Sequence, residues 1–196
     1  MSKKIILTEK QAKLFRKFIL ENITYEDITK EASNADINPT EPQKEKGNYK
    51  MGHINVRGFK ITIENAKGSI RCYKNDDGTE GKNILKNHYG YFSRTKGKDG
   101  DHVDVFIGDY LDFDKVYVVD QINPKNDEFD ESKVMLGFKT IEKAKSAYLS
   151  NYDKNWEGFK AITGVSVPVF KKWLYRQHKQ RKPFSEYVGI IKRKEE

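Results

Sequence analysis

The sequence predicts an α+β domain whose sheet is mainly antiparallel, either strongly curved or closed into a barrel, with helices on its flanks. From about residue 49 the chain breaks into short apolar runs separated by Gly, Asn and Asp, a pattern typical of β-strands joined by turns. These runs follow one another too closely for crossover helices, so neighbouring strands are expected to pair antiparallel. Two helical patterns follow the last of these runs.

Residues 1–47 are predicted to form a helical N-terminal extension and a linker. Two pairs of residues have the spacing of a helix capping box and predict two helices in this part of the chain: Thr8 with Gln11, and Thr24 with Asp27. Apolar residues recur at helical intervals after the first pair. The stretch 33–48 contains two prolines and has no apolar periodicity, so we interpret it as a linker.

Residues 48–196 are predicted to form the main domain. Its expected strands are rich in β-branched and aromatic residues: Ile54–Phe59, Lys60–Glu64, Ser69–Tyr73, His102–Ile107, Lys115–Asp120 and Lys133–Phe138. One helix is expected over 140–152, and a second over 166–182 with Pro168 in its first turn, where a missing N–H costs nothing. Residues 186–192 are expected to add a final edge strand.

Composition and charge narrow the class of partner. The chain has 196 residues and a net charge of +8, which favours anionic partners, either a small phosphorylated substrate or nucleic acid. Residues 171–182 hold six Lys or Arg and no acid, and form either a nucleic-acid contact or a solvated helix face. No apolar run is long enough for a membrane span, and we expect a cytoplasmic protein. The single Cys72 excludes an intramolecular disulfide.

An acidic cluster at residues 99–104 is the strongest candidate for a site. Asp99, Asp101 and Asp104 stand where a loop leads into an apolar strand, and Gly100 allows a tight turn between two of them. We expect the three carboxylates to converge. Unpaired, they would repel and raise one another's pKa, and a hard divalent cation is the usual partner that relieves this. A solvated acidic turn is the alternative interpretation.

Four segments in order place this cluster in a longer pattern over residues 59–154. They are Glu64-Asn65-Ala66-Lys67-Gly68-Ser69 with Tyr73, His88-Tyr89-Gly90-Tyr91 followed by the cluster, Asp130-Glu131-Ser132-Lys133-Val134, and Tyr152-Asp153-Lys154. Together they resemble the family I soluble inorganic pyrophosphatases. With the lead-in from Asn48 to His53, the chain is similar to the pyrophosphatase-like domains of phage and mobile-element polyvalent proteins. The resemblance implies a five-stranded OB-like barrel with the site at its mouth, and a phage-encoded protein would act in the host cytoplasm.

The resemblance also implies a role for each matching residue. The expected ligands for Mg²⁺, or alternatively Mn²⁺, are Asp99, Asp104, Glu131 and Glu64. Asp101 corresponds to the residue that deprotonates the metal-bound water, and Lys133 and Tyr89 are also assigned to catalysis. The expected substrate-binding residues are Arg71, Lys133, Tyr89, Tyr152 and Lys154. The implied activity is Mg²⁺-dependent hydrolysis of a phosphoanhydride, either inorganic pyrophosphate or a nucleotide di- or triphosphate.

The sequence departs from the family pattern in the outer part of this site. Cys72 replaces a phosphate-binding lysine, with Arg71 next to it, and Lys74 replaces an acidic residue. These departures favour an altered substrate. The alternative function is a non-catalytic, phage-encoded module that binds nucleotides, DNA or a host protein. The helical extension at residues 8–30 would then dock a partner or a second copy of the chain in a homo-oligomer.

Overall fold

The computed structural model describes residues 8, 9, 11, 23–36, 38–74, 78, 80–175 and 181–195. The strands in chain order are β1 (Gly52–Val56), β2 (Phe59–Asn65), β3 (Ile70–Lys74), β4 (Glu80–Ile84), β5 (His88–Phe92), β6 (Asp104–Ile107), β7 (Lys115–Ile122), β8 (Phe129–Leu136) and β9 (Phe159–Ser166). The helices are α2 (Tyr25–Ala32), α3 (Glu41–Lys46), α4 (Ile141–Ser150), α5 (Val167–Leu174) and α6 (Phe184–Glu195). Within these residues, none of the helices has the length and apolar character needed to cross a membrane.

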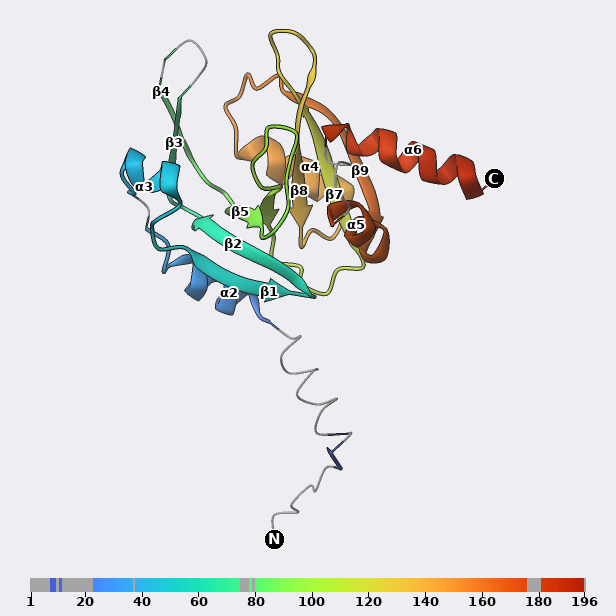
Figure 1. Cartoon of the computed structure of the whole chain (residues 1–196), viewed down its shortest axis with the longest axis horizontal. Coiled ribbons are helices and arrows are strands. Elements are labelled where there is room, and N and C mark those ends of the chain that lie inside the picture. Colours follow the sequence, from blue (N-terminus) through green and yellow to red (C-terminus); the bar gives the residue numbers. More distant parts are fainter. Residues whose placement is uncertain are drawn as a thin grey trace.

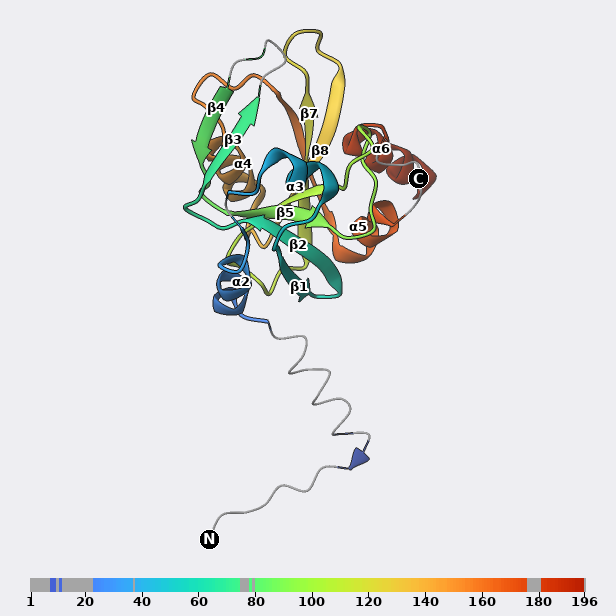
Figure 2. The same cartoon turned by 60° about the vertical axis from the view of Figure 1, so that its left-hand side comes forward.

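A seven-stranded sheet in the order β1-β2-β5-β6-β8-β7-β9 forms the centre of the molecule. Neighbouring strands run antiparallel, except that β6 and β8 are parallel. Strands β3 and β4 form a separate hairpin that projects from the sheet (Figure 1). Figure 2 shows α4 on one side of the central strands and α5 and α6 on the other.

Alternate residues of the central strands pack into two cores on opposite faces of the sheet. Val116 and Val118 of β7 join the larger core, which also contains residues of β1, β2, α2, α5 and α6. Tyr117 and Val119 of the same strand join the smaller core with α4. Because both faces are covered, β7 is a nearly continuous apolar run, as is usual for a fully buried strand.

The predicted α+β class and the mainly antiparallel pairing are confirmed, but the five-stranded OB-like barrel is not. In the described part of the chain the sheet has seven strands, and its end strands β1 and β9 each pair with one neighbour, so no closure is seen. Strands β4, β5 and β9 have no counterpart among the predicted strands. Each of them contains a glycine, which weakens the local strand signal.

The N-terminal helices agree in part with the sequence. Thr24 caps α2 as predicted, because its side chain accepts the N–H of Asp27 and the Asp27 carboxylate accepts the N–H of Thr24. Residues 41–46 form α3, so the linker prediction is wrong for them. Gln43 explains the helix, since its Oε1 accepts the N–H of Thr40 at 2.9 Å. The apolar residues of the first predicted helix lie outside the described residues.

The predicted edge strand at residues 186–192 is wrong, because these residues belong to α6. The buried Asp120 of β7 supplies the cap of this helix, and its carboxylate accepts the N–H groups of Phe184 at 2.6 Å and Ser185 at 3.0 Å. No local pattern shows a cap supplied from a distant strand. The helices predicted over 140–152 and from residue 166 are present as α4 and α5, although α5 ends at Leu174.

Candidate active site

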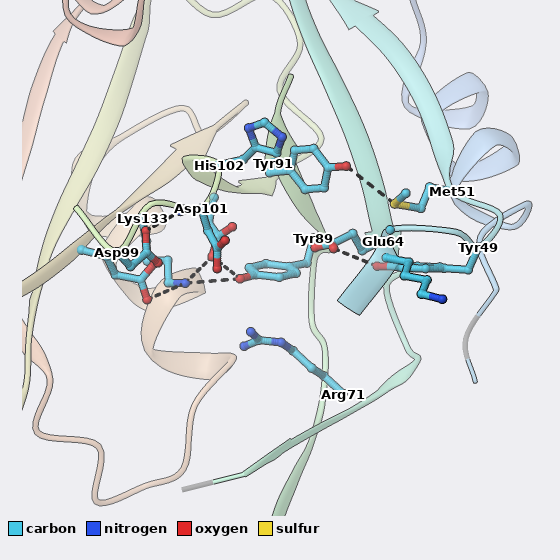
Figure 3. A pocket seen from close by; sticks show the side chains of 14 residues that line it. Tyr49, Met51, Glu64, Arg71, Tyr89, Tyr91, Asp99, Asp101, His102 and Lys133 are labelled. Carbon is cyan, nitrogen blue, oxygen red and sulfur yellow. Dashed lines mark hydrogen bonds and ion pairs between the residues drawn. The ribbon is translucent and has the colours of Figure 1, made fainter. Parts of the chain in front are cut away.

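A cavity of about 630 Å³ is lined by residues of β2, β3, β5, β6 and β8 and of the loop before β6 (Figure 3). Its charged lining residues are Lys46, Glu64, Arg71, Asp99, Asp101, Asp104, Glu131 and Lys133. All the site residues predicted from the sequence line this cavity, except Tyr152 and Lys154. They come from five separate segments of the chain, so the sheet, rather than a single loop, brings them together.

Close backbone contact sets the position of the strand that carries Tyr89. At Gly90 an added Cβ would lie 2.0 Å from the carbonyl oxygen of Thr62 and 2.8 Å from Cα of Ile63. Only glycine therefore lets β5 approach β2 so closely. The approach places Tyr89, which pairs with Asn65, next to the end of the strand that carries Glu64.

Lys133 is the centre of the charged group. Its side chain is 4% exposed, and its Nζ donates to Oδ2 of Asp104, forms an ion pair with Oε1 of Glu131 at 2.8 Å, and donates to the hydroxyl of Tyr89 at 3.2 Å. Burial by itself lowers the pKa of Lys133, but Asp104, Tyr89 and Glu131 more than offset this, and the net shift is upward. The ammonium therefore stays charged and holds two carboxylates from β6 and β8 together.

The aromatic wall supports this centre. Tyr89 is 2% exposed, its hydroxyl donates to Oδ2 of Asp104, and burial followed by Asp104 raises its pKa. The guanidinium of Arg71 lies 4.6 Å from the centroid of the Tyr89 ring, as in a cation–π contact. Tyr89 thus remains a hydroxyl donor at neutral pH, with cations on two sides of it.

Glu64 and Glu131 carry carboxylates in an unfavourable environment. Burial is the main cause that raises the pKa of each, and the charge of Asp104 raises both further. Tyr49 offsets part of this at Glu64, because its hydroxyl donates to Oε1 at 3.0 Å. A second cation near these groups would therefore be favourable.

The acidic loop turns as predicted, with Gly100 at a φ of 98°. Asp99 and Asp101 are exposed at the cavity mouth, while Asp104 is partly buried deeper inside. Oδ1 of Asp99 accepts the N–H of Asp101 at 3.0 Å, so this carboxylate is used by its own loop. Across the described residues no group of three or more His, Cys, Asp or Glu side chains is arranged to hold a metal ion. The expected convergence of Asp99, Asp101 and Asp104 is therefore seen only as a shared lining of the cavity, with Asp104 paired to Lys133.

Tyr152 does not line the cavity, but it lies near enough to Lys133 for that charge to affect the pKa of its hydroxyl, and its substrate contact stays a prediction. Its hydroxyl donates to Oε1 of Gln121 at 3.0 Å, and its ring stacks on Trp156 at 4.7 Å. Gln121 in turn donates to Oε1 of Glu131 at 3.0 Å, so Tyr152 acts on the site through this amide. Lys154 is exposed and does not line the cavity, and its substrate contact stays a prediction.

Sequence reasoning did not identify several residues that shape the site. Tyr49 follows the linker and belongs to no motif that predicted a site role, although it lies in the lead-in from Asn48 to His53 on which part of the family resemblance rests. His102 lines the cavity and stacks on Tyr91 with ring centroids 4.6 Å apart. Gln121 lies in an apolar run, where a lone amide is the one available signal of a buried polar network.

The described residues of the basic stretch at 171–182 do not line this cavity. Nζ of Lys171 donates to the carbonyl oxygen of Arg57 at 2.9 Å, and Lys182 pairs with Glu186 at 2.8 Å. Residues 176–180, which hold two of its six basic residues, lie outside the described residues. Binding of nucleic acid through this stretch stays a prediction.

Comparison with known proteins places these residues in a family. No curated protein and no solved structure matches the chain. A family model described as inorganic pyrophosphatase matches residues 41–175, which is more than half of the chain and includes every residue that lines the charged cavity. The chain therefore belongs to the inorganic pyrophosphatase family.

Proposed function

We propose that the protein hydrolyses a phosphoanhydride in the charged cavity by attack of an activated water. The observation that carries this proposal is the buried Lys133 held between Asp104 and Glu131, beside Tyr89 and Arg71. These cations and the tyrosine hydroxyl offer donors to phosphate oxygens, while the carboxylates offer ligands and a base. Membership of the pyrophosphatase family supports the same chemistry. A phage origin and a cytoplasmic location also stay proposals.

The cavity carries carboxylates of the kind that the Mg²⁺ implied by the family resemblance would need, although within the described residues no three of them are already grouped around one metal position. Mg²⁺ prefers oxygen ligands, and the cavity offers them from Glu64, Asp99, Asp104 and Glu131. The raised pKa values of Glu64 and Glu131 support this proposal, because an added cation would offset the cost of burying their charge. When bound, such an ion lowers the pKa of a coordinated water and polarises the phosphorus. Mn²⁺ is the expected substitute.

The side chains of this chain supply the remaining functions. Asp101, exposed at the mouth, is the group proposed to accept the proton of the attacking water. Arg71 and Lys133 neutralise the charge that grows on the departing phosphate oxygen. Tyr89 keeps its proton at neutral pH and donates to a phosphate oxygen.

Phosphate release by the purified protein with Mg²⁺ or Mn²⁺ tests this proposal, with pyrophosphate and nucleotides as substrates. Asp101→Asn should lower kcat on the order of 10²–10⁴-fold, the usual contribution of a general base. Asp109→Asn is the matched control, because Asp109 is exposed just after β6 and does not line the cavity. No release from any substrate, or an Asp101→Asn variant as active as the control, would refute the proposal.

A further inference from the structure

A second cavity of about 590 Å³ adjoins the first. The two cavities share four lining residues, Tyr49, Glu64, Arg71 and Tyr89. The second extends between the β3–β4 hairpin and the segment that precedes α3, and in Figures 1 and 2 the α3 segment lies beside this hairpin. Arg71 therefore stands at the boundary, where one ligand could contact both spaces.

One wall of the second cavity comes from residues outside the family match. Asp36, Asn38 and Pro39 line it and precede the matched region at 41–175. Hydrogen bonds hold this segment in place, because the N–H of Asp36 donates to the carbonyl oxygen of Lys50 at 2.8 Å and the N–H of Asn38 donates to Oδ1 of Asp36 at 3.0 Å. This wall therefore lies outside the part of the chain that matches the family.

The opposite wall carries a departure from the family pattern. Cys72 of β3 stands where the resemblance expects a phosphate-binding lysine, and it pairs across the hairpin with Lys82 of β4. Both residues line the second cavity and neither lines the first. Ile70, two positions before Cys72 on the same strand, also lines this space and is 53% exposed. One departure from the family pattern, Cys72, therefore lines a space next to the proposed reaction centre.

The chemistry of these walls differs from that of the first cavity. Two acids, Asp36 and Glu64, balance two cations, Arg71 and Lys82, so the lining has no excess charge to bind a further phosphate. Apolar and amide surface completes it. A cavity of this size, part apolar with a few polar groups, suits a compact organic group that carries hydroxyl and amide functions.

We propose that the substrate is a nucleoside di- or triphosphate whose phosphates bind near Arg71, Tyr89 and Lys133 and whose nucleoside fills the second cavity. This inference rests on the proposed function and names its substrate class. The terminal phosphate then lies farthest from the second cavity. Water forms a new bond to the terminal phosphorus as the bond to the bridging oxygen breaks. The electron pair of that bond leaves with the shortened nucleotide, and Asp101 receives a proton of the water.

The Cys72→Trp variant tests the assignment, because Cys72 is exposed and a bulky side chain there would fill the second cavity. We expect kcat/KM for nucleoside triphosphates to fall by at least about tenfold, while kcat/KM for pyrophosphate stays within about twofold. Leu149→Trp on α4 is the control, since Leu149 is 38% exposed and lines neither cavity, and it should change neither value. Tripolyphosphate is included as a longer substrate without a nucleoside.

The outcomes separate the two proposals. If the wild type hydrolyses pyrophosphate but Cys72→Trp treats all substrates alike, the second cavity is not a nucleoside site, although the proposed function stands. If tripolyphosphate is lost together with nucleotides, the space holds a third phosphate and the inference is wrong. If no substrate is hydrolysed, the proposed function fails, and calorimetry with a non-hydrolysable nucleoside triphosphate decides this inference. Binding that Cys72→Trp abolishes supports it, whereas absent or unchanged binding overturns it.

Discussion

Gln121 is the residue whose removal should reveal how the site is supported. It is 4% exposed, and all the hydrogen-bonding capacity of its amide is used. Its Oε1 accepts the hydroxyls of Tyr148 at 2.8 Å and Tyr152 at 3.0 Å, and its Nε2 donates to Asp130 at 3.1 Å and Glu131 at 3.0 Å. The two tyrosine donors fix the orientation of the amide, so its N–H groups must face the two carboxylates.

The substitution Gln121→Met keeps a similar volume but removes these four hydrogen bonds. It leaves two buried hydroxyl donors without their acceptor, and each such group costs about 1–3 kcal/mol. Glu131 keeps its ion pair with Lys133 at 2.8 Å, so the carboxylates that lose the amide donor contribute less to the loss of stability. We therefore expect the free energy of unfolding to fall by about 3 kcal/mol. Urea unfolding monitored by tryptophan fluorescence and by circular dichroism measures it.

A double-mutant cycle with Tyr152→Phe isolates the hydrogen bond itself. In the wild-type background Tyr152→Phe should cost about 1 kcal/mol, because it removes one donor to Gln121. In the Gln121→Met background the same change should cost nothing or stabilise, since it removes an unpaired buried hydroxyl. A loss below about 1 kcal/mol for Gln121→Met, or additive effects of the two substitutions, would contradict this account of the network.

Three further predictions follow from other contacts. His88 is buried and accepts the N–H of Lys67, and burial, followed by the charge of Lys67, lowers its pKa from 6.5 to about 4. As pH falls, His88 of the unfolded chain therefore binds a proton before His88 of the folded chain does. Between about pH 6.5 and about pH 4, the free energy of unfolding should decrease by about 2 kcal/mol more in the wild type than in His88→Asn. Urea unfolding across this pH range measures the difference. Gly90→Ala should destabilise the fold by about 2 kcal/mol, because the added Cβ clashes with the backbone of β2. Gly189→Ala is the control and should not destabilise it, since no heavy atom lies within 4 Å of the Cβ that would be added there. Thermal unfolding compares the two variants. Lys133→Met should cost about 3–5 kcal/mol at pH 7, because Asp104 and Glu131 lose their shared cation. The loss should shrink at pH 5, because burial raises the pKa of Glu131 and favours its neutral form. Equal losses at both pH values would refute the ionic explanation.

The site residues themselves could be predicted from sequence because their signals are local. The turn at Gly100 and the spacing of the three aspartates lie within six residues, and the structure places all of them on one cavity wall. Tyr89, Glu131 and Lys133 were recognised through short segments in a characteristic order. Such patterns identify which side chains belong to a site, but they carry no information on the distances between segments.

The tertiary structure alone decided how these groups are connected. Lys133 joins Asp104 to Glu131 because β6 and β8 lie side by side, although β7 separates them in the chain. The packing of the segment after α4 against β7 also brings the Tyr152 hydroxyl to Gln121. The start of α6 likewise depends on Asp120, 64 residues before it.

The sequence by itself thus determined the α+β class, most of the charged residues that line the cavity, and the tight acidic turn. Helix caps, glycine turns and alternation depend on neighbours a few residues apart, so they can be read along the chain. The ion pairs, the buried amide network and the second cavity arise between segments that meet only when the sheet forms. Their partners depend on strand order and register, which a single sequence does not specify.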